Sequence, residues 1–247
     1  AVAFHDDNAR YVFEQTGVKP HIGLDDRFDG QIGAFPMVYF SRGCPAYNKG
    51  CGNCPVPRLE GSTFRLFRDA IPAGMLLDNN LSALDDDWQD FIIRRYAESW
   101  KGGKVDANSG FEPHSFTDAT MRRWEHFPLA CWRFGYDALC ERPAALEMMA
   151  RLRAAGHSGQ RVRVYTLVGN EPREVCEQRI REVIDAGCHP WPQRLRPLNW
   201  LGGPLPTFHR WDEPTLIAFQ RFYSIAGLWK RLQPSEFYYQ GRYPLAA

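Results

Sequence analysis

The sequence lacks the long apolar run that a membrane-spanning helix requires, because no stretch approaches roughly 18 uninterrupted apolar residues. Its first residues carry neither the basic segment nor the apolar segment of a secretory signal peptide. The charge is nearly balanced, with a formal net charge of +1, so the chain has no global attraction to nucleic acids or acidic membranes. These absences predict a cytoplasmic protein that has no membrane partner.

Low-complexity segments and internal repeats are also missing, and the composition is that of an ordinary globular protein. A chain of 247 residues is long enough to form a single α/β barrel. Seven cysteines are an odd number in a chain too large to need disulfides. This favours a reducing compartment, in which thiols remain free for metal binding or packing.

Apolar runs alternate with segments of helical period along most of the chain. Six runs have the length and flanking residues of buried strands: 34–41, 74–80, 104–110, 129–137, 161–169 and 189–198. Segments with helical spacing and end signals lie between or after them: 84–100, 116–127, 141–157, 171–188 and 213–232. Strand followed by helix, repeated with right-handed crossovers, predicts a parallel α/β sheet that curls into a full or partial barrel. A doubly wound open sheet is the alternative.

The alternation also predicts the organisation of the chain. Residues 1–33 form a polar N-terminal extension that lies outside the pattern, and residues 34–200 form the barrel core. Residues 201–247 are expected to pack on the barrel as a C-terminal segment of helix and aromatic residues.

Three cysteines lie in a loop rich in Gly, Pro and Asn after the first predicted strand. Six residues separate Cys44 from Cys51 and two separate Cys51 from Cys54, so the three thiols can converge on one point. Structural zinc usually has four protein ligands, and no histidine lies near enough in the sequence to complete the set. Cysteine thiolates hold iron–sulfur clusters, so three of them favour a [4Fe–4S] cluster with one open iron. A zinc site completed by a distant residue is the alternative.

Polar residues and glycines follow the other predicted strands, where parallel α/β barrels carry their chemistry. Each is a weak signal alone, because Asn, Asp and Gly also end strands as plain turn formers. Together with the cysteine loop they predict a polar small molecule that lies over a metal centre. The predicted cofactor-binding residues are Asp78, Asn79, Asn80, Asn108, Gly110, Arg133, Asp137 and Gly169.

The segment FSRGCPAYNKGCGNCPVPRLEG resembles the cluster loop of the radical S-adenosylmethionine superfamily, which follows the first strand of a partial (β/α)6 TIM-like barrel. LLDNN stands where that family binds the methionine amino group, and KVDANSGFEP and RVRVYTLVGN stand where its ribose, carboxylate and adenine contacts gather. The resemblance spans roughly residues 34–200. Two features depart from it: the spacing is Cys-x6-Cys-x2-Cys instead of the usual Cys-x3-Cys-x2-Cys, and Asn53 replaces a residue that is often aromatic.

The resemblance implies that Cys44, Cys51 and Cys54 hold a [4Fe–4S] cluster and that S-adenosyl-L-methionine is the second cofactor. It implies an external one-electron reductant of the flavodoxin or ferredoxin type. The implied activity is reductive cleavage of S-adenosylmethionine to a 5′-deoxyadenosyl radical, which takes a hydrogen atom from the substrate. The alternative is a non-catalytic iron–sulfur or zinc-binding barrel protein used for binding or electron transfer.

The substrate is expected to face the fifth and sixth predicted strands, because the strand ends before them are assigned to cluster and cofactor. Cations, amides and aromatic rings there suit a polar substrate of nucleotide or RNA type. The candidate substrate residues are Tyr165, Asn170, Glu171, Arg194, Arg196, Asn199 and Trp200.

Overall fold

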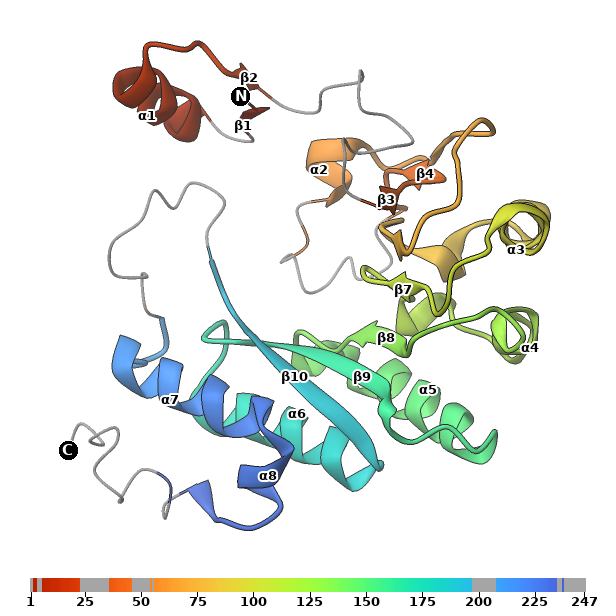
Figure 1. The fold of residues 1–247 in the computed structure, drawn as a ribbon. Helices are drawn as coiled ribbons and strands as arrows, with labels where there is room; N and C mark the ends of the chain where they lie inside the picture. The colour runs from red at the N-terminus through yellow and green to blue at the C-terminus, as the bar shows by residue number, and fades with distance from the viewer. Residues whose placement is uncertain are drawn as a thin grey trace. The chain divides into compact units, whose positions relative to one another are not determined.

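The computed structural model describes residues 2–3, 6–22, 36–45, 54, 56–196, 208–234 and 237. The chain divides into two compact units, Ala1–Phe134 and Gly135–Ala247. In both units helices alternate with strands of parallel sheets (Figure 1). The protein is therefore a mixed α/β protein, as the alternation in the sequence predicts.

Unit 1 is built on a three-stranded parallel sheet in the order β3–β6–β7. Parallel bridges from Val105 to Leu129 and from Phe111 to Phe134 continue the pairing beyond β7. Neighbouring strands of this sheet therefore follow one another in the order of the sequence. The strands are β3 (Met37–Val38), β6 (Met75–Leu76) and β7 (Asp106–Ala107).

The helices of unit 1 begin at the polar residues that the sequence offers as caps. Asp85 accepts a hydrogen bond from the Trp88 N–H at the start of α3, and Thr117 accepts one from the Thr120 N–H at the start of α4. Aromatic side chains, among them Phe40, Tyr96 and Trp124, fill the core beside these helices. The helices are α2 (Val56–Glu60), α3 (Asp86–Ser99) and α4 (Asp118–Trp124), with short 3-10 turns η2 (Leu81–Ala83) and η3 (Pro113–Ser115).

The N-terminal segment has more regular structure than its polar sequence indicates. Helix α1 covers Asp6–Thr16, and the short strands β1 (Val2–Ala3) and β2 (His21–Ile22) pair in parallel around it. The sequence pattern missed this helix because polar residues occupy most of its positions.

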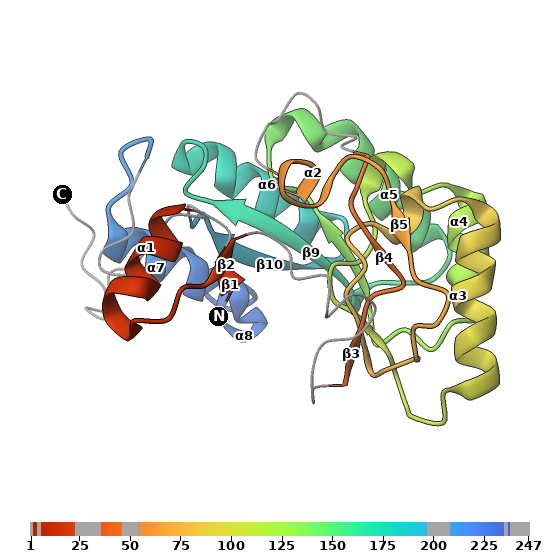
Figure 2. The same cartoon turned by 90° about the horizontal axis from the view of Figure 1, so that it is seen from above.

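Unit 2 contains the strands β9 (Gly159–Val168) and β10 (Cys188–Arg194), which pair in parallel. Strand β8 (Trp132–Gly135) lies at the division between the units. Helix α6 packs against β9 and β10, and α7 packs against β10 (Figures 1 and 2). The helices are α5 (Arg142–Ala154), α6 (Arg173–Asp185), α7 (Glu213–Ser224) and α8 (Ala226–Trp229), with the 3-10 turn η4 (Leu139–Glu141).

The sequence located all six strands of the alternation, since each predicted run contains or overlaps one of β3, β6, β7, β8, β9 and β10. The last helical segment differs from the prediction, because it breaks into α7 and α8 at Ile225, whose backbone is extended (φ −111°, ψ 101°). Within the described part of the chain the sheets do not close into a barrel. No helix there is long and apolar enough to cross a membrane.

Candidate metal and cofactor site

A short antiparallel pair closes the base of the cysteine loop. Strand β4 (Ser41–Arg42) pairs with β5 (Arg65–Leu66), and the Cys44 N–H donates to the Gly61 carbonyl over 3.1 Å. Gly43 has φ +91°, and a Cβ there would lie 2.2 Å from the Thr63 carbonyl oxygen. Only glycine fits this turn, so the chain enters the loop with a fixed direction.

Glu60, at the end of α2, connects three parts of this base. Its carboxylate accepts hydrogen bonds from Arg42 Nη2 (3.1 Å), the Gly43 N–H (3.2 Å) and Asn79 Nδ2 (2.7 Å). Burial alone would raise the pKa of Glu60, but the hydrogen bonds from Arg42, Asn79 and Gly43 lower it below its usual value. Glu60 therefore remains ionised at neutral pH and links the loop to the end of β6.

Removal of the Glu60 carboxylate should destabilise the protein. In Glu60→Ala the Arg42 guanidinium, whose side chain is only 10% exposed, loses its anionic partner. We expect a loss of about 3 kcal/mol in the free energy of unfolding, measured by urea denaturation, because removing one partner of a buried ion pair is strongly destabilising. Glu147→Ala removes a 71% exposed partner of Arg151 and should cost less than about 0.5 kcal/mol. Equal losses in the two variants would contradict the role given to Glu60.

Asp78 fixes the end of β6 against the chain that leads into the loop. Its side chain is fully buried, and its carboxylate accepts hydrogen bonds from the Phe40 N–H (3.0 Å) and the Ser41 hydroxyl (2.5 Å). Burial raises the pKa of Asp78 to about 7, although these hydrogen bonds oppose the rise. Asp78 thus acts in this structure as a buried tie between two strands.

The raised pKa of Asp78 predicts a specific dependence of stability on pH. The folded protein favours the neutral carboxyl, whereas the unfolded chain ionises near pH 4. The contribution to stability is therefore complete below about pH 4 and is lost as the pH rises through about 7. Between pH 5 and pH 8 the wild type should lose on the order of 2 kcal/mol relative to Asp78→Asn, which does not titrate. Parallel curves of unfolding free energy against pH for the two proteins would refute this.

Asn80 brings the end of β6 to the first cysteine. Its Oδ1 accepts the Ala83 N–H (3.1 Å) and the Ser82 hydroxyl (3.0 Å), which caps η2 and fixes the orientation of the amide. Its Nδ2 therefore points toward Cys44 and lies 3.7 Å from the sulfur. Asn80 is 1% exposed, so this orientation is held by its buried surroundings.

Cys44 and Cys54 lie close enough to affect each other electrostatically. Burial raises the pKa of Cys44 to about 11; the hydrogen bond from Asn80 lowers it, and Cys54, Glu112 and Glu60 raise it further. A bound cation is therefore needed to hold Cys44 as a thiolate at neutral pH. Cys51 lies outside the described residues, and within those residues no group of three or more His, Cys, Asp or Glu side chains could hold a metal ion.

The four cysteines outside the loop fall into two groups. Cys131, Cys176 and Cys188 are buried reduced thiols, the behaviour of small apolar side chains. Cys140 is disulfide-bonded, which departs from the expectation that every thiol remains free.

The residues after β7 and in β8 are held by contacts between strands of unit 1. The Asn108 N–H donates to the Leu76 carbonyl, which pairs the ends of β7 and β6. Gly110 has φ +74°, and a Cβ there would lie 2.3 Å from the Arg133 carbonyl oxygen, so the close approach requires glycine. The Arg133 guanidinium forms a 2.6 Å ion pair with Asp106. Its charge is therefore met by a carboxylate of the same unit.

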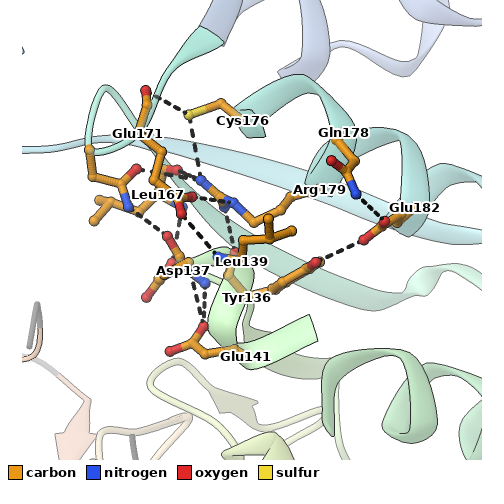
Figure 3. Close-up of polar contacts among 12 residues, drawn as sticks. Tyr136, Asp137, Leu139, Glu141, Leu167, Glu171, Cys176, Gln178, Arg179 and Glu182 are labelled. Atoms are coloured by element: carbon orange, nitrogen blue, oxygen red, sulfur yellow. Dashed lines mark hydrogen bonds and ion pairs between the residues drawn. The ribbon is translucent and has the colours of Figure 1, made fainter. Parts of the chain in front are cut away.

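Three predicted site residues of unit 2 meet around an arginine that the sequence analysis did not single out (Figure 3). The Arg179 side chain is fully buried and donates to Glu171 Oε2 over 2.9 Å. It also donates to the carbonyls of Tyr136 and Leu167, each over 2.7 Å, and to Asn170 Oδ1 over 3.4 Å. The signal in the sequence was an arginine on the apolar face of the 171–188 helix, in which Cys176, Ile180 and Val183 are the buried neighbours.

Asp137 and Asn170 complete this network. Asp137 Oδ1 accepts the Leu167 N–H over 3.0 Å, and Asn170 Nδ2 donates to the Asp137 carbonyl over 2.7 Å. Burial and the neighbouring Glu141 raise the pKa of Asp137 to about 7, while Arg179 opposes the rise. Each of these side chains thus has partners within unit 2, and together they fix the ends of β8 and β9 (Figure 3).

The remaining predicted residues of unit 2 lie on or after β9 and β10. Gly169 has φ +91° at the end of β9, where a Cβ would lie 3.2 Å from the Leu216 side chain. Tyr165 lies within β9 and its carbonyl accepts the Tyr136 N–H. Arg194 ends β10, and Arg196 follows it in an exposed position. Asn199 and Trp200 lie outside the described residues.

Comparison with known proteins assigns no family to this arrangement. No family model matches the sequence, and no curated protein matches it.

Proposed function

We propose that the chain is a radical S-adenosylmethionine enzyme in which Cys44, Cys51 and Cys54 hold a [4Fe–4S] cluster. The observation that carries the proposal is the contact between Asn80 and Cys44, which joins the end of β6 to the start of the cysteine loop. Ligand sites of parallel α/β folds lie at the carboxyl ends of strands, and residues after β3 and β6 meet at such an end. The spacing of the three cysteines supplies the donor set, and all three thiols must be reduced before the cluster assembles.

The residues present fit the cluster by their chemistry. Cys44 and Cys54 influence each other electrostatically, and Cys44 is a neutral thiol until a cation binds. The Asn80 amide donates toward the Cys44 sulfur, and hydrogen bonds to ligating sulfurs tune the reduction potential of an iron–sulfur cluster. When bound, the cluster would supply the electron that cleaves S-adenosylmethionine reductively.

The protein's own residues would position the loop and the second cofactor. Glu60 and Asp78 hold the base of the loop, and Asn79 and Asn80 present amides beside it. We assign Asp78, Asn79 and Asn80 to the amino group of S-adenosylmethionine and Asn108, Arg133 and Asp137 to its carboxylate and ribose. Gly110 and Gly169 are assigned to the same cofactor. For Arg133 this role requires the guanidinium to share Asp106 with the cofactor or to leave it.

The proposal also covers the fold, the location, the reductant and the class of substrate. We propose a partial (β/α)6 barrel over residues 34–200, supported by parallel strands that follow chain order in each unit. We propose a cytoplasmic location, an external flavodoxin or ferredoxin type reductant, and a polar substrate of nucleotide or RNA type. The substrate residues would be Tyr165, Asn170, Glu171, Arg194, Arg196, Asn199 and Trp200.

Electron paramagnetic resonance of the anaerobically reconstituted and reduced protein tests this function. An iron that lacks a protein ligand should bind S-adenosylmethionine directly, so addition of the cofactor should change the spectrum of the reduced cluster. 5′-Methylthioadenosine, which lacks the amino and carboxylate groups that would bind the iron, serves as the control compound. A cluster whose spectrum is unaffected by S-adenosylmethionine would favour a non-catalytic iron–sulfur protein. Tight binding of one zinc and no iron would favour a zinc-binding protein.

A further inference from the structure

Unit 2 contains a cavity that shares no residue with the candidate metal and cofactor site. Its volume is about 190 Å³, and it lies at the N-terminal ends of β9 and β10 beside α8. The pairing of these strands shifts there, because Cys188 lies opposite Gly159 whereas His189 lies opposite Arg163. A register shift of this kind disrupts the ladder and bends the strand locally. The lining residues are Gly159, Gln160, Ile184, Gly187, Cys188, His189, Ala226, Trp229 and Lys230.

The polar side chains that line the cavity provide hydrogen-bond donors. Gln160 Nε2 lies 3.1 Å from His189 Nδ1, and an amide nitrogen can only donate, so the imidazole accepts there and carries its proton on Nε2. The buried Trp229 Nε1–H finds no hydrogen-bond partner in the described part of the chain. A buried donor of this kind costs about 1–3 kcal/mol unless a partner is provided. Protein atoms cover this N–H, so a ligand in the cavity does not reach it.

The charges around the cavity are positive. Lys230 lies at its exposed edge, and its Nζ is 5.4 Å from the centre of the Trp229 ring. Burial lowers the pKa of His189, and Arg163 and Lys230 lower it further, so both cations lie near the imidazole. None of the lining residues named above carries a carboxylate. An anion in the cavity would therefore find compensating positive charge, whereas a cation would be repelled.

The rest of the lining favours a flat apolar body. Ile184 and Ala226 contribute aliphatic surface, and the rings of His189 and Trp229 lie 6.3 Å apart. A cavity of about 150 Å³ lined by apolar side chains binds benzene, so this volume accommodates one ring with a small substituent. We propose that the cavity binds a monocyclic aromatic carboxylate, with the ring against Trp229 and Ile184 and the carboxylate toward Lys230.

Benzoate is the probe for this proposal, and benzamide is its neutral counterpart of the same shape. Titration of the full chain, followed by ligand-observed NMR, should give millimolar binding of benzoate and about tenfold weaker binding of benzamide, as expected for one charge-assisted contact. Lys230→Gln should weaken benzoate binding several-fold and leave benzamide unchanged. Trp229→Leu removes the aromatic ring and should weaken the binding of both ligands.

Arg231→Gln is the matched control, because it removes the same charge from the next residue, which is exposed and does not line the cavity. It should leave the affinity for benzoate within about twofold of the wild type. Equal affinities for benzoate and benzamide, or no detectable binding of benzoate, would overturn the proposal. Inorganic phosphate that displaces benzoate at equal concentration would also overturn it, because the cavity would then recognise charge without the ring.

Discussion

Replacement of Cys44 by alanine is expected to abolish the visible absorption of the protein after anaerobic reconstitution with iron and sulfide. The reason is that the proposed cluster has only three protein ligands, so each thiolate holds a large share of the binding free energy. Iron and acid-labile sulfide should fall from one cluster per chain to near zero. Cys51→Ala and Cys54→Ala should behave in the same way, and absorption spectra with iron and sulfide assays measure the effect.

Cys188→Ala is the matched control, because Cys188 is a buried reduced thiol whose side chain packs in unit 2. It should retain the full iron and sulfide content and the full absorption. A cluster that survives intact in Cys44→Ala would contradict the assignment of this cysteine as a ligand. Loss of the cluster in Cys188→Ala, in a protein that remains folded by circular dichroism, would contradict the assignment of the three loop cysteines as the complete set.

Replacement of Arg179 by methionine should cause one of the largest losses of stability available in unit 2. The variant fills a similar volume but leaves the carbonyls of Tyr136 and Leu167 and the Glu171 carboxylate without their buried donor. We expect a loss of about 3–5 kcal/mol in the free energy of unfolding, because breaking a buried ion pair leaves the remaining partners uncompensated. Arg179→Lys keeps the charge but cannot reproduce the planar fork, so it should also be clearly destabilised.

Arg181→Ala provides the comparison on the same helix. Its side chain is 53% exposed and pairs with Glu177 one turn away, so its removal should change stability by less than about 0.5 kcal/mol. Urea denaturation of the three variants measures these differences. A loss in Arg179→Met no larger than in Arg181→Ala would show that the network in Figure 3 contributes little to folding.

The strands and most helices could be predicted from the sequence because they depend on local signals. Apolar runs mark the buried strands, and Gly156 and Gly187 have the positive φ angles, 84° and 75°, expected of residues that end helices. The break at Ile225 could not be predicted in this way, because the apolar period continues from α7 into α8. Only tertiary packing distinguishes one long helix from two short ones there.

The sequence predicted which types of residue form the candidate site, but it predicted few of the contacts between them. The cysteine spacing and the Asp78–Asn80 segment indicated a site, and the structure brings Asn80 to Cys44. Glu60 and Arg179 were missed because their importance depends on partners 8 to 43 residues away in the chain, which no local pattern identifies. Burial of these charges is a property of the folded state alone.

Formation of 5′-deoxyadenosine tests the central proposal most directly. The reconstituted protein is reduced with dithionite under anaerobic conditions, incubated with S-adenosylmethionine, and analysed by liquid chromatography and mass spectrometry. We predict that the wild type forms 5′-deoxyadenosine and methionine, and that Cys44→Ala forms neither. Absence of 5′-deoxyadenosine in wild-type protein that carries a complete cluster, or equal formation in Cys44→Ala, would contradict the proposed function.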